Sequence, residues 1–458
     1  MLTADDVVAA LCDRPHFSFS GDRRLTFRRV VVDSRQVEAG DLFVALAEGS
    51  TDGHLYVGDA LRRGATGVLA RVDRFGGPVE MAPSALFLID DTLRALQAIA
   101  AYWRRRHTVR VVGVTGSVGK TTTRDVLAAV LSARYKVLKS EKNFNNEIGL
   151  PLTLLRLDHW HEMAVLEMGM YAAGEIDLLC RLALPEIGVI TNVGPSHLER
   201  LGSIERIAAA KEELVQNLPA HGLAVLNGDD ALVRAMAERS PARVVFYGTT
   251  PFCDVWGSEI LNRGLAGTSF RLHAGDREMN VLLPLLGRPG VYAALAAVAV
   301  GLAQGTSWSD LAQGLSQVTA GTRLAVYRAI HGATVIDDTY NASPASMAAA
   351  LEVLKAAGGR RIAILGDMLE LGSLEVEGHQ AAGRAAAAAA DLLVVVGPRA
   401  RIIGEEAARN GLAIVFYADN NAQAADIVRT VLRAGDCVLV KGSNGMKMGE
   451  IVGRLRAE

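Results

Sequence analysis

The chain has 458 residues, more than one core normally holds, because single hydrophobic cores stop growing at about 250 to 300 residues. Half of the residues are hydrophobic, 21% are charged and the net charge is −2, which excludes a disordered chain and a basic binder of nucleic acid or membrane surfaces. The four cysteines form no CxxC pair, and the N-terminus lacks the basic start and apolar run of a signal peptide. We expect a cytoplasmic, monomeric protein of two or three domains, without a membrane-spanning segment.

The first part of the chain has the pattern of a small α/β module. Short apolar runs alternate with Gly and Asp turns, at residues 30–32, 42–46, 67–70 and 85–89. We place the end of this first domain at residue 84, beside the turn at Pro83.

Two series of β-branched runs follow, each separated by long helical stretches. The runs of the first series lie at residues 109–114, 163–168, 187–191 and 223–226, and those of the second at 334–336, 362–365, 392–396, 414–416 and 437–440. Such alternation predicts parallel sheets with crossover helices. The sequence therefore predicts an α/β protein of three domains: residues 1–84, a central P-loop-type domain with a mostly parallel sheet at 85–320, and a Rossmann-like domain at 321–458.

A glycine-rich loop, GVTGSVGKTT at residues 113–122, follows the first strand of the central domain and precedes a helical run. In such a loop the backbone N–H groups surround phosphate oxygens, Lys120 neutralises the terminal phosphates and Thr121 offers its hydroxyl to Mg²⁺. The other residues predicted to line the phosphates are Gly116, Ser117, Gly119 and Thr122. An ordinary glycine turn is the alternative, because Val114 stands where the standard motif has its first glycine. The order of strand, loop and helix favours a triphosphate site, and the absence of an NKxD motif argues against a GTPase.

Polar residues also follow two later strands of the central domain. Glu167 ends the run at 163–168, where folds of this kind hold Mg²⁺. The segment TNVGPSHLE at 191–199 leaves the next strand and contains His197. Taken alone, Glu167 is equally well a surface carboxylate, His197 a solvated loop histidine and Lys211 a solvated helix lysine.

Four segments together resemble the Mur ligase family: the loop at 113–122, KNFNNEIGLP at 142–151, EMG at 167–169 and TNVGPSHLERLG at 191–202. The similarity covers nearly the whole chain. Within the family, NNEIGLPLTLL, EMGMYAAGEI and GDMLELG are most similar to the member that adds the last dipeptide. The resemblance implies ATP- and Mg²⁺-dependent ligation of D-alanyl-D-alanine to UDP-N-acetylmuramoyl-tripeptide through an acyl phosphate, in peptidoglycan precursor synthesis.

The resemblance also implies roles for particular residues in each domain. In the first domain it implies UDP-sugar binding by Ser34, Arg35, Asp52, Gly53 and His54. In the central domain it implies tripeptide contacts for Asn143, Asn145 and Asn146, Mg²⁺ ligation by Thr121, Glu167 and His197, and CO₂ carried by Lys211 as a carbamate, whose oxygens suit Mg²⁺ better than an ammonium does. In the third domain it implies closure over ATP by Arg323, Asp338, Tyr340 and Asn341, and dipeptide binding by Asp367, Lys441 and Ser443.

Two other functions remain open on the sequence alone. A folylpolyglutamate-type ligase shares the expected fold, but the DSR and DGH segments at 33–35 and 52–54 favour a UDP-sugar domain. A nucleotide-regulated binding protein without turnover is disfavoured by the combination of Lys120, Glu167, His197 and Lys211. The sequence leaves open whether the tripeptide ends in diaminopimelate or in lysine.

One stretch departs from the family pattern. Residues 287–297, GRPGVYAALAA, match a family stretch that faces the adenine and usually reads G-x-H-N-x-x-N-A-L-A-A. Pro289, Gly290 and Ala293 replace its His and two Asn, and they carry no side-chain hydrogen-bonding group. We expect weak discrimination between nucleotide bases.

Overall fold

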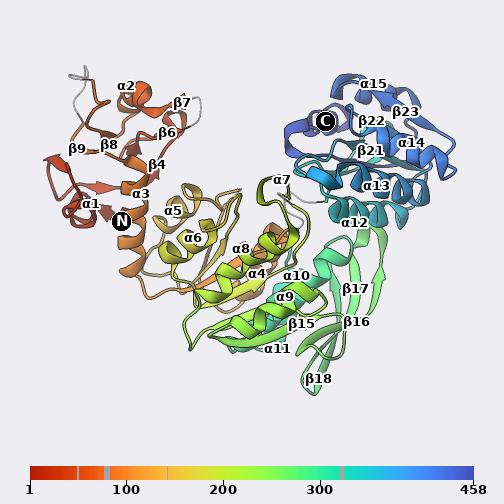
Figure 1. Ribbon diagram of the computed structural model, residues 1–458, viewed down its shortest axis with the longest axis horizontal. Helices are drawn as coiled ribbons and strands as arrows, with labels where there is room; N and C mark the ends of the chain where they lie inside the picture. The colour runs from red at the N-terminus through yellow and green to blue at the C-terminus, as the bar shows by residue number, and fades with distance from the viewer. Residues whose placement is uncertain (49–50, 77–82, 142, 197, 320–323, 458) are drawn as a thin grey trace. The chain divides into compact units, whose positions relative to one another are not determined.

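The computed structural model describes residues 1–48, 51–76, 83–141, 143–196, 198–319 and 324–457. The chain divides into two compact units, which are treated separately below (Figure 1). Unit 1 contains Met1–Gly113, Tyr135–Met170 and Gly174–Glu186, and unit 2 contains Val114–Arg134, Tyr171–Ala173 and Ile187–Glu458. Both units are built of strands and helices in alternation, and the predicted α/β fold class is confirmed.

The N-terminal part of unit 1 is built on a five-stranded sheet of order β2-β9-β8-β5-β4. Its strands are β2 (Ser18–Gly21), β4 (Val30–Val31), β5 (Leu42–Val44), β8 (Gly67–Arg71) and β9 (Ala85–Ile89). Only the β2–β9 pair is antiparallel. Because β9 pairs with β8 throughout its length, the sheet extends past residue 84. The boundary predicted at residue 84 stays a prediction.

Short ribbons and helices complete this part of unit 1. The ribbons pair β1 (Leu2–Thr3) with β3 (Thr26–Phe27), and β6 (Ala47–Glu48) with β7 (Thr51–Asp52). The helices are α1 (Ala4–Leu11), α2 (Val57–Arg62) and α3 (Thr92–Arg105). Asp91 caps α3 by accepting the N–H of Arg94 at 2.9 Å, which satisfies one of the amides that a helix start leaves free.

The rest of unit 1 contains strands in the order β11-β12-β10 and two helices. These elements are β10 (Arg110–Thr115), whose last two residues belong to unit 2, β11 (Val137–Lys139), β12 (Met163–Glu167), α5 (Gly149–Leu154) and α6 (Glu175–Ala183). The strands β11 and β12 run parallel. Every residue of β12 is buried, as expected of a strand that is covered on both faces.

Unit 2 begins with a six-stranded run of order β13-β14-β15-β16-β17-β18. The strands are β13 (Ile187–Ile190), β14 (Leu223–Asn227), β15 (Arg243–Gly248), β16 (Val255–Asn262), β17 (Thr268–Ala274) and β18 (Arg277–Leu283). The helices are α4 (Lys120–Ser132), α7 (Leu198–Leu201), α8 (Ile204–Gln216), α9 (Ala231–Ala235), α10 (Arg288–Ala303) and α11 (Trp308–Ser316). The strands β13 to β16 are parallel, while β17 and β18 return antiparallel at the end of the series.

Helix α10 is apolar on all sides. Of its residues, Gly290, Val291 and all from Ala293 to Gly301 are buried, which is typical of a helix enclosed by other elements. It packs against α4, the helix that follows the phosphate loop (residues 113–122), and against β15 and β16. Pro289 lies in its first turn, where a missing N–H costs nothing.

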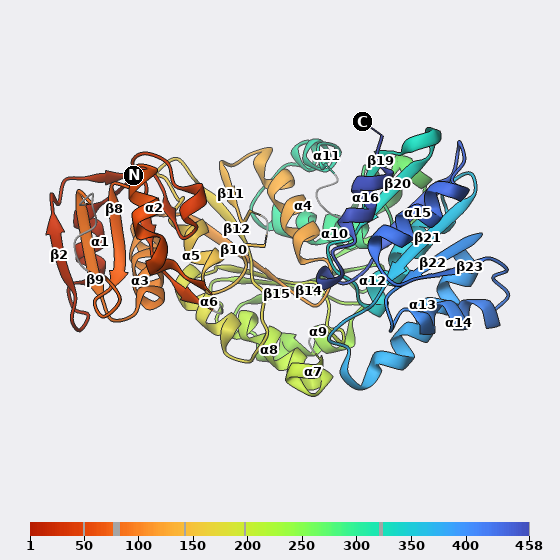
Figure 2. The same ribbon diagram turned by 90° about the horizontal axis from the view of Figure 1, so that it is seen from above.

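The C-terminal part of unit 2 is a six-stranded sheet of order β19-β20-β24-β21-β22-β23. Its strands are β19 (Ala325–Arg328), β20 (Thr334–Asp338), β21 (Arg361–Gly366), β22 (Leu392–Val396), β23 (Val415–Ala418) and β24 (Cys437–Lys441), and its helices are α12 (Pro344–Lys355), α13 (Glu375–Ala389), α14 (Arg401–Arg409), α15 (Asn421–Val431) and α16 (Gly449–Leu455). Only the β19–β20 pair is antiparallel. Helices α13 and α14 cover one face of β21, β22 and β23, and α15 and α16 cover the other (Figure 2).

Two expectations about the whole chain concern cysteines and the membrane. Cys12, Cys180, Cys253 and Cys437 are all free thiols in the structure. Among the described helices, none combines the length and the apolar character needed to cross a bilayer.

Candidate active site

The phosphate loop joins the end of β10 to the start of α4, as the sequence predicts. Gly116 and Gly119 both have positive φ angles, +148° and +89°, which a residue with a side chain rarely adopts. The Nζ of Lys120 turns back over the loop and donates to the carbonyl oxygens of Gly116 (2.8 Å) and Ser117 (3.3 Å). The loop thus holds a cation above its own backbone, as a site for a polyanion requires.

Residues 191–194, which leave β13, bind directly to this loop. The Asn192 side chain accepts the N–H of Val118 at 2.9 Å and donates to its carbonyl oxygen at 2.8 Å. Thr191 Oγ1 donates to the same oxygen at 2.7 Å. Ser117 Oγ donates to the Gly194 carbonyl at 3.0 Å and accepts its N–H at 2.8 Å. Sequence analysis found the polar segment after this strand but gave no role to Asn192.

Lys211 lies on α8, which is capped by Ser203. Its side chain is only 2% exposed, so the interpretation as a solvated helix lysine is wrong. Burial lowers the pKa of its ammonium well below the ordinary value, and the positive charge of Lys120 lowers it further. No described carboxylate forms an ion pair with Lys211. Both effects favour the neutral amine, the form that reacts with CO₂.

Glu167 ends β12 in unit 1 and is also buried, at 3% exposure. Its Oε1 accepts a hydrogen bond from Asn145 Nδ2 at 2.9 Å. Glu167, which the resemblance assigns to Mg²⁺, therefore contacts Asn145, which it assigns to the tripeptide. The backbone carbonyl of Asn143 accepts the N–H of Asn145. Asn146 instead accepts the N–H of Gly149 at the start of α5. His197 lies outside the described residues, and within the described part of the chain no three His, Cys, Asp or Glu side chains form a metal cluster.

In the N-terminal part of unit 1, Asp52 at the end of β7 and the turn of Gly53 and His54 form a local network of hydrogen bonds. Asp52 Oδ1 accepts the N–H of His54 at 3.0 Å and lies 2.6 Å from its Nδ1, while His54 Nε2 accepts the N–H of Arg71 at 2.9 Å. Gly53 is buried, and a Cβ there would collide with the backbone of Leu46. The hydrogen bonds from His54, and the ion pair with Arg74, lower the pKa of Asp52 to about 2. Both ring nitrogens of His54 are used within the protein, so His54 shapes this turn.

The DSR turn has one buried and one exposed polar residue. Asp33 accepts the N–H of Arg35 and forms an ion pair with its guanidinium at 2.8 Å. The Arg35 side chain is 81% exposed, whereas Ser34 is only 6% exposed. Arg35 is therefore the member of this turn that is accessible to an anionic ligand.

In the sheet of the C-terminal part of unit 2, called the third sheet below, β20 and β24 run parallel. Their register pairs the last residue of each strand, Asp338 with Lys441. Lys441 Nζ donates to Asp338 Oδ2 at 2.5 Å and to the Asn341 carbonyl at 2.9 Å. Lys441 is 1% exposed and Asp338 6%, while Tyr340 is 36% exposed. Asp338 and Asn341, which the resemblance assigns to ATP, thus lie beside Lys441, which it assigns to the dipeptide. Arg323 lies outside the described residues.

Asp367 follows β21 and is 4% exposed. Its Oδ1 accepts the N–H of Ala400 at 2.7 Å, and burial raises its pKa. Its backbone carbonyl accepts the N–H of Ser443, and Ser443 Oγ accepts the N–H of Leu369 at 2.9 Å. Asp367 and Ser443 therefore fix two loops at the carboxyl end of this sheet.

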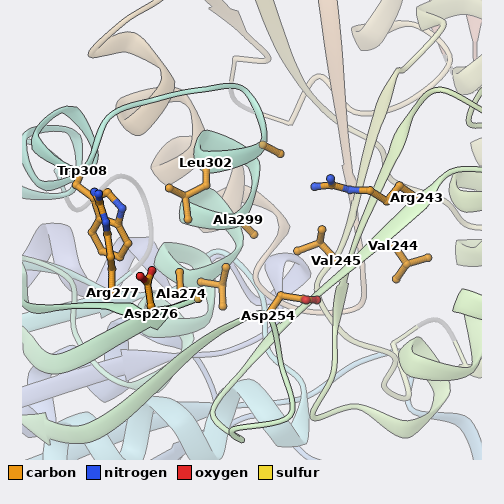
Figure 3. Close-up of a pocket in the computed structure, with 13 residues that line it drawn as sticks. Arg243, Val244, Val245, Asp254, Ala274, Asp276, Arg277, Ala299, Leu302 and Trp308 are labelled. Atoms are coloured by element: carbon orange, nitrogen blue, oxygen red, sulfur yellow. The ribbon is translucent and has the colours of Figure 1, made fainter.

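An open depression of about 630 Å³ lies elsewhere, beside β15, β16 and the β17–β18 turn. Leu302 and Val245 line it, with Trp308 and Arg277 on one side and Arg243 on the other (Figure 3). None of the predicted site residues lines it.

A phosphate loop on one parallel sheet, followed by a second parallel sheet, defines a nucleotide-dependent α/β enzyme. Comparison with known families agrees. The Mur ligase middle domain matches residues 114–301, and the Mur ligase, glutamate ligase domain matches residues 322–444. The chain belongs to the Mur ligase family, as its resemblance predicted.

Individual relatives are similar along nearly their whole length. The UDP-N-acetylmuramoyl-tripeptide--D-alanyl-D-alanine ligase of Bacillus subtilis is 39% identical over 433 residues, or 92% of each chain. The ligase of the same name from Escherichia coli is 33% identical over 94% of each chain.

Solved structures agree with these relatives. MurF from Acinetobacter baumannii is 30% identical, has a TM-score of 0.86 and covers 98% of both chains. MurF ligase from Thermotoga maritima, solved with ADP, is 30% identical, has a TM-score of 0.80 and covers 94% of this chain and 98% of its own. Both support the predicted three-domain architecture.

Proposed function

We propose that the chain is the ATP-dependent ligase for which these relatives are named. It joins D-alanyl-D-alanine to UDP-N-acetylmuramoyl-tripeptide in peptidoglycan precursor synthesis, in the cytoplasm. The observation that carries this proposal is the phosphate loop, in which Lys120 Nζ lies over the carbonyl oxygens of Gly116 and Ser117. The burial of Lys211, at 2% exposure, supports it, because a solvated helix lysine would be exposed.

The reaction proceeds in two steps. A carboxylate oxygen of the tripeptide attacks the γ-phosphorus of ATP, and ADP leaves with the electrons of the broken P–O bond. The dipeptide amine then attacks the acyl phosphate carbon, and the C–O bond to phosphate breaks as the amide forms and the amine loses a proton. Lys120 neutralises charge on the transferring phosphoryl group, and the loop amides hold its oxygens in position.

Mg²⁺ would be held by the Thr121 hydroxyl, the Glu167 carboxylate, His197 and an anionic Lys211. The hydroxyl and carboxylate oxygens fit the ion, and a neutral lysine amine can add CO₂ to become a further oxygen donor beside the histidine nitrogen. When bound, Mg²⁺ neutralises phosphate charge. The buried Lys211, with its lowered pKa and no described carboxylate partner, supports a carbamate at this position.

The substrates are assigned to domains by the same proposal. The DSR and DGH turns bind the UDP-sugar, with Arg35 as the exposed cation, and Asn143, Asn145 and Asn146 bind the tripeptide. Asp338, Tyr340, Asn341 and Arg323 close over ATP, and Asp367, Lys441 and Ser443 surround the dipeptide site. Because a related ligase from Acinetobacter baumannii is named for a substrate that contains 2,6-diaminopimelate, diaminopimelate is the proposed third residue here.

The test is phosphate release by the purified chain with ATP and Mg²⁺. We expect release only when D-alanyl-D-alanine and the UDP-linked tripeptide are both present, and more with the diaminopimelate tripeptide than with the lysine one. A folate substrate with glutamate serves as the control, because folylpolyglutamate synthase from Mycobacterium tuberculosis shares the fold at 18% identity. Release with folate and none with the tripeptide would overturn the proposal.

A further inference from the structure

The backbone amides of the phosphate loop fall into two groups. Ser117 donates its N–H to the Asn192 carbonyl at 2.9 Å, and Val118 donates its N–H to Asn192 Oδ1 at 2.9 Å. The N–H groups of Gly119 and Thr121 donate to no atom of the described residues. One half of the loop is therefore bonded to the protein, and the other half retains its donors.

The two glycines of the loop show the same division. A Cβ at Gly116 would collide with Thr191 Oγ1, so the chain must approach the strand end too closely for any side chain. A Cβ at Gly119 would meet no atom of the described residues within 4 Å. The loop thus has a packed side against residues 191–194 and an open side at Gly119.

Asn192 is the centre of the packed side. Its carboxamide engages both the backbone N–H and the backbone carbonyl of one residue, Val118. The strand end that carries it is itself held, because Asn227 Nδ2 donates to the Thr191 carbonyl at 2.8 Å and Asp230 Oδ2 accepts the N–H of Val193 at 2.8 Å. A side chain fixed on both sides can impose its geometry on a glycine-rich loop, which has no stiffness of its own.

We propose that Asn192 is a positioning residue that holds the Ser117–Val118 half of the loop in its ATP-binding shape and leaves the amides of Gly119 and Thr121 to bind the phosphates. The inference rests on the use of ATP in the proposed function. In this proposal the carboxamide acts on ATP binding through its bonds to Val118. It removes, before binding, the conformational freedom that the loop would otherwise lose when ATP arrives, and such preorganisation improves affinity.

The experiment measures ADP binding to the full-length chain by calorimetry, together with KM for ATP and kcat. Asn192→Ala is expected to weaken ADP binding and raise KM for ATP about tenfold or more, with a smaller effect on kcat. Thr191→Val removes one bond to Val118 without a change of side-chain shape, and is expected to raise KM several-fold. Should Asn192→Ala fail to fold, Thr191→Val keeps the test decisive.

Asn227→Ala is the matched control, because Asn227 is a buried carboxamide that holds the same strand end without touching the loop. It is expected to lower the melting temperature and to raise KM for ATP clearly less than Asn192→Ala does, because the direct bonds of Asn192 to the loop remain. Equal KM increases in Asn227→Ala and Asn192→Ala would reduce Asn192 to a structural role. Unchanged or tighter ADP binding in Asn192→Ala would overturn the proposal, because the carboxamide would then be neutral or compete with phosphate for the Val118 N–H.

ADP binding needs neither the tripeptide nor the dipeptide. Failure of the ligase assay with normal ADP binding by the parent chain would therefore refute the proposed substrates and leave the role of Asn192 intact. Normal ligation by the parent chain, together with unchanged ADP binding in Asn192→Ala, would refute the role of Asn192 and leave the proposed substrates intact.

Discussion

The phosphate loop and the Asp338–Lys441 edge of the third sheet both lie at carboxyl ends of parallel strands, but they are built differently. In the loop, the N–H groups of Gly119 and Thr121 donate to no atom of the described residues, and Lys120 donates to the carbonyl oxygens of Gly116 and Ser117. At the third-sheet edge, Lys441 is bonded to a carboxylate and both side chains are buried. The first region is arranged for a ligand with negative charge, whereas the second already contains the countercharge of its cation.

This difference shows which kind of site can be predicted from a sequence. The loop is local, because strand, glycines, lysine and helix follow one another within about a dozen residues, so its spacing predicts its geometry. The Asp338–Lys441 pair joins residues that are 103 positions apart. Only the strand order and register bring them together, and no spacing rule contains that information.

Lys120→Ala gives the sharpest test of the first region. It removes the cation that faces the phosphates, and we expect kcat/KM to fall by more than about a hundredfold, or about 2.7 kcal/mol. Steady-state phosphate release measures the loss, with Lys136→Ala as a control lysine outside the loop. Retention of more than about a tenth of the parent kcat/KM would show that the loop does not work as described.

Lys211→Ala is the second variant, and it is expected to leave little activity. Small carboxylic acids should restore part of the activity, because they supply the anion that the carbamate provides. Lys211→Arg, which keeps a positive charge but cannot form a carbamate, should be as inactive and resist rescue. Since the lowered pKa makes the amine neutral over more of the pH range, parent activity in low bicarbonate should rise with pH. Full activity of Lys211→Ala in bicarbonate-free buffer would remove the residue from the mechanism.

The third test concerns the ion pair of the third sheet. Lys441→Met leaves the Asp338 carboxylate buried without its cation, which typically costs about 3 to 5 kcal/mol of stability. The double variant Asp338→Asn with Lys441→Met removes both charges and should be more stable than Lys441→Met alone. Thermal unfolding of the two single variants and the double variant measures the coupling. Additive losses would mean that the pair is not coupled.

Nucleotide selectivity gives a smaller effect. Pro289, Gly290 and Ala293 offer no side-chain hydrogen bond, and the Tyr292 hydroxyl already donates to Asp229 at 2.8 Å. With two hydrogen bonds of about 0.5 to 1.5 kcal/mol missing, discrimination should be relaxed by about ten- to a hundredfold. The measurement is kcat/KM for ATP, GTP and ITP. A several-thousandfold preference for ATP would show that other groups read the base.

The smallest expected effect is the loss of the Asp52 contribution to the stability of the first domain in acid. The pKa of Asp52 is about 2 in the folded chain against 3.8 ordinarily, so its ionised form stabilises the fold above about pH 3.8 and this contribution is lost as the pH falls towards 2. Because the side chain is 29% exposed, the effect should stay below about 1 kcal/mol. Melting of Asp52→Asn at pH 3 and pH 7 should show a shallower pH dependence than the parent. Identical dependence would contradict this account.

Much of the fold could be predicted from periodicity. The buried runs of β12, β13, β21, β22 and β24 are continuous and apolar, and their positions matched the structure closely. The antiparallel strands β17 and β18 were not predicted. Their alternating pattern, with Arg271 and Glu278 at the less buried positions, carries a weaker signal than the continuous apolar run of a parallel-sheet strand.

The site was predictable only in part. Lys120 could be read from its motif, but the burial of Lys211 could not, because a lysine in a helix has the same sequence pattern whether it faces water or a core. Asn192 carried a faint signal as one of two polar residues at a strand end. Its contact with Val118 depends on tertiary structure, since the two residues are 74 positions apart.

The central claim is that the tripeptide carboxylate is activated by phosphoryl transfer, and oxygen labelling tests it most directly. The tripeptide is prepared with ¹⁸O in its reacting carboxylate and converted with ATP and D-alanyl-D-alanine, and the released phosphate is analysed by mass spectrometry. We predict that one labelled oxygen appears in each phosphate, because the carboxylate oxygen that attacks phosphorus leaves with it. Unlabelled phosphate, with or without amide product, would contradict the acyl phosphate and with it the role assigned to the phosphate loop.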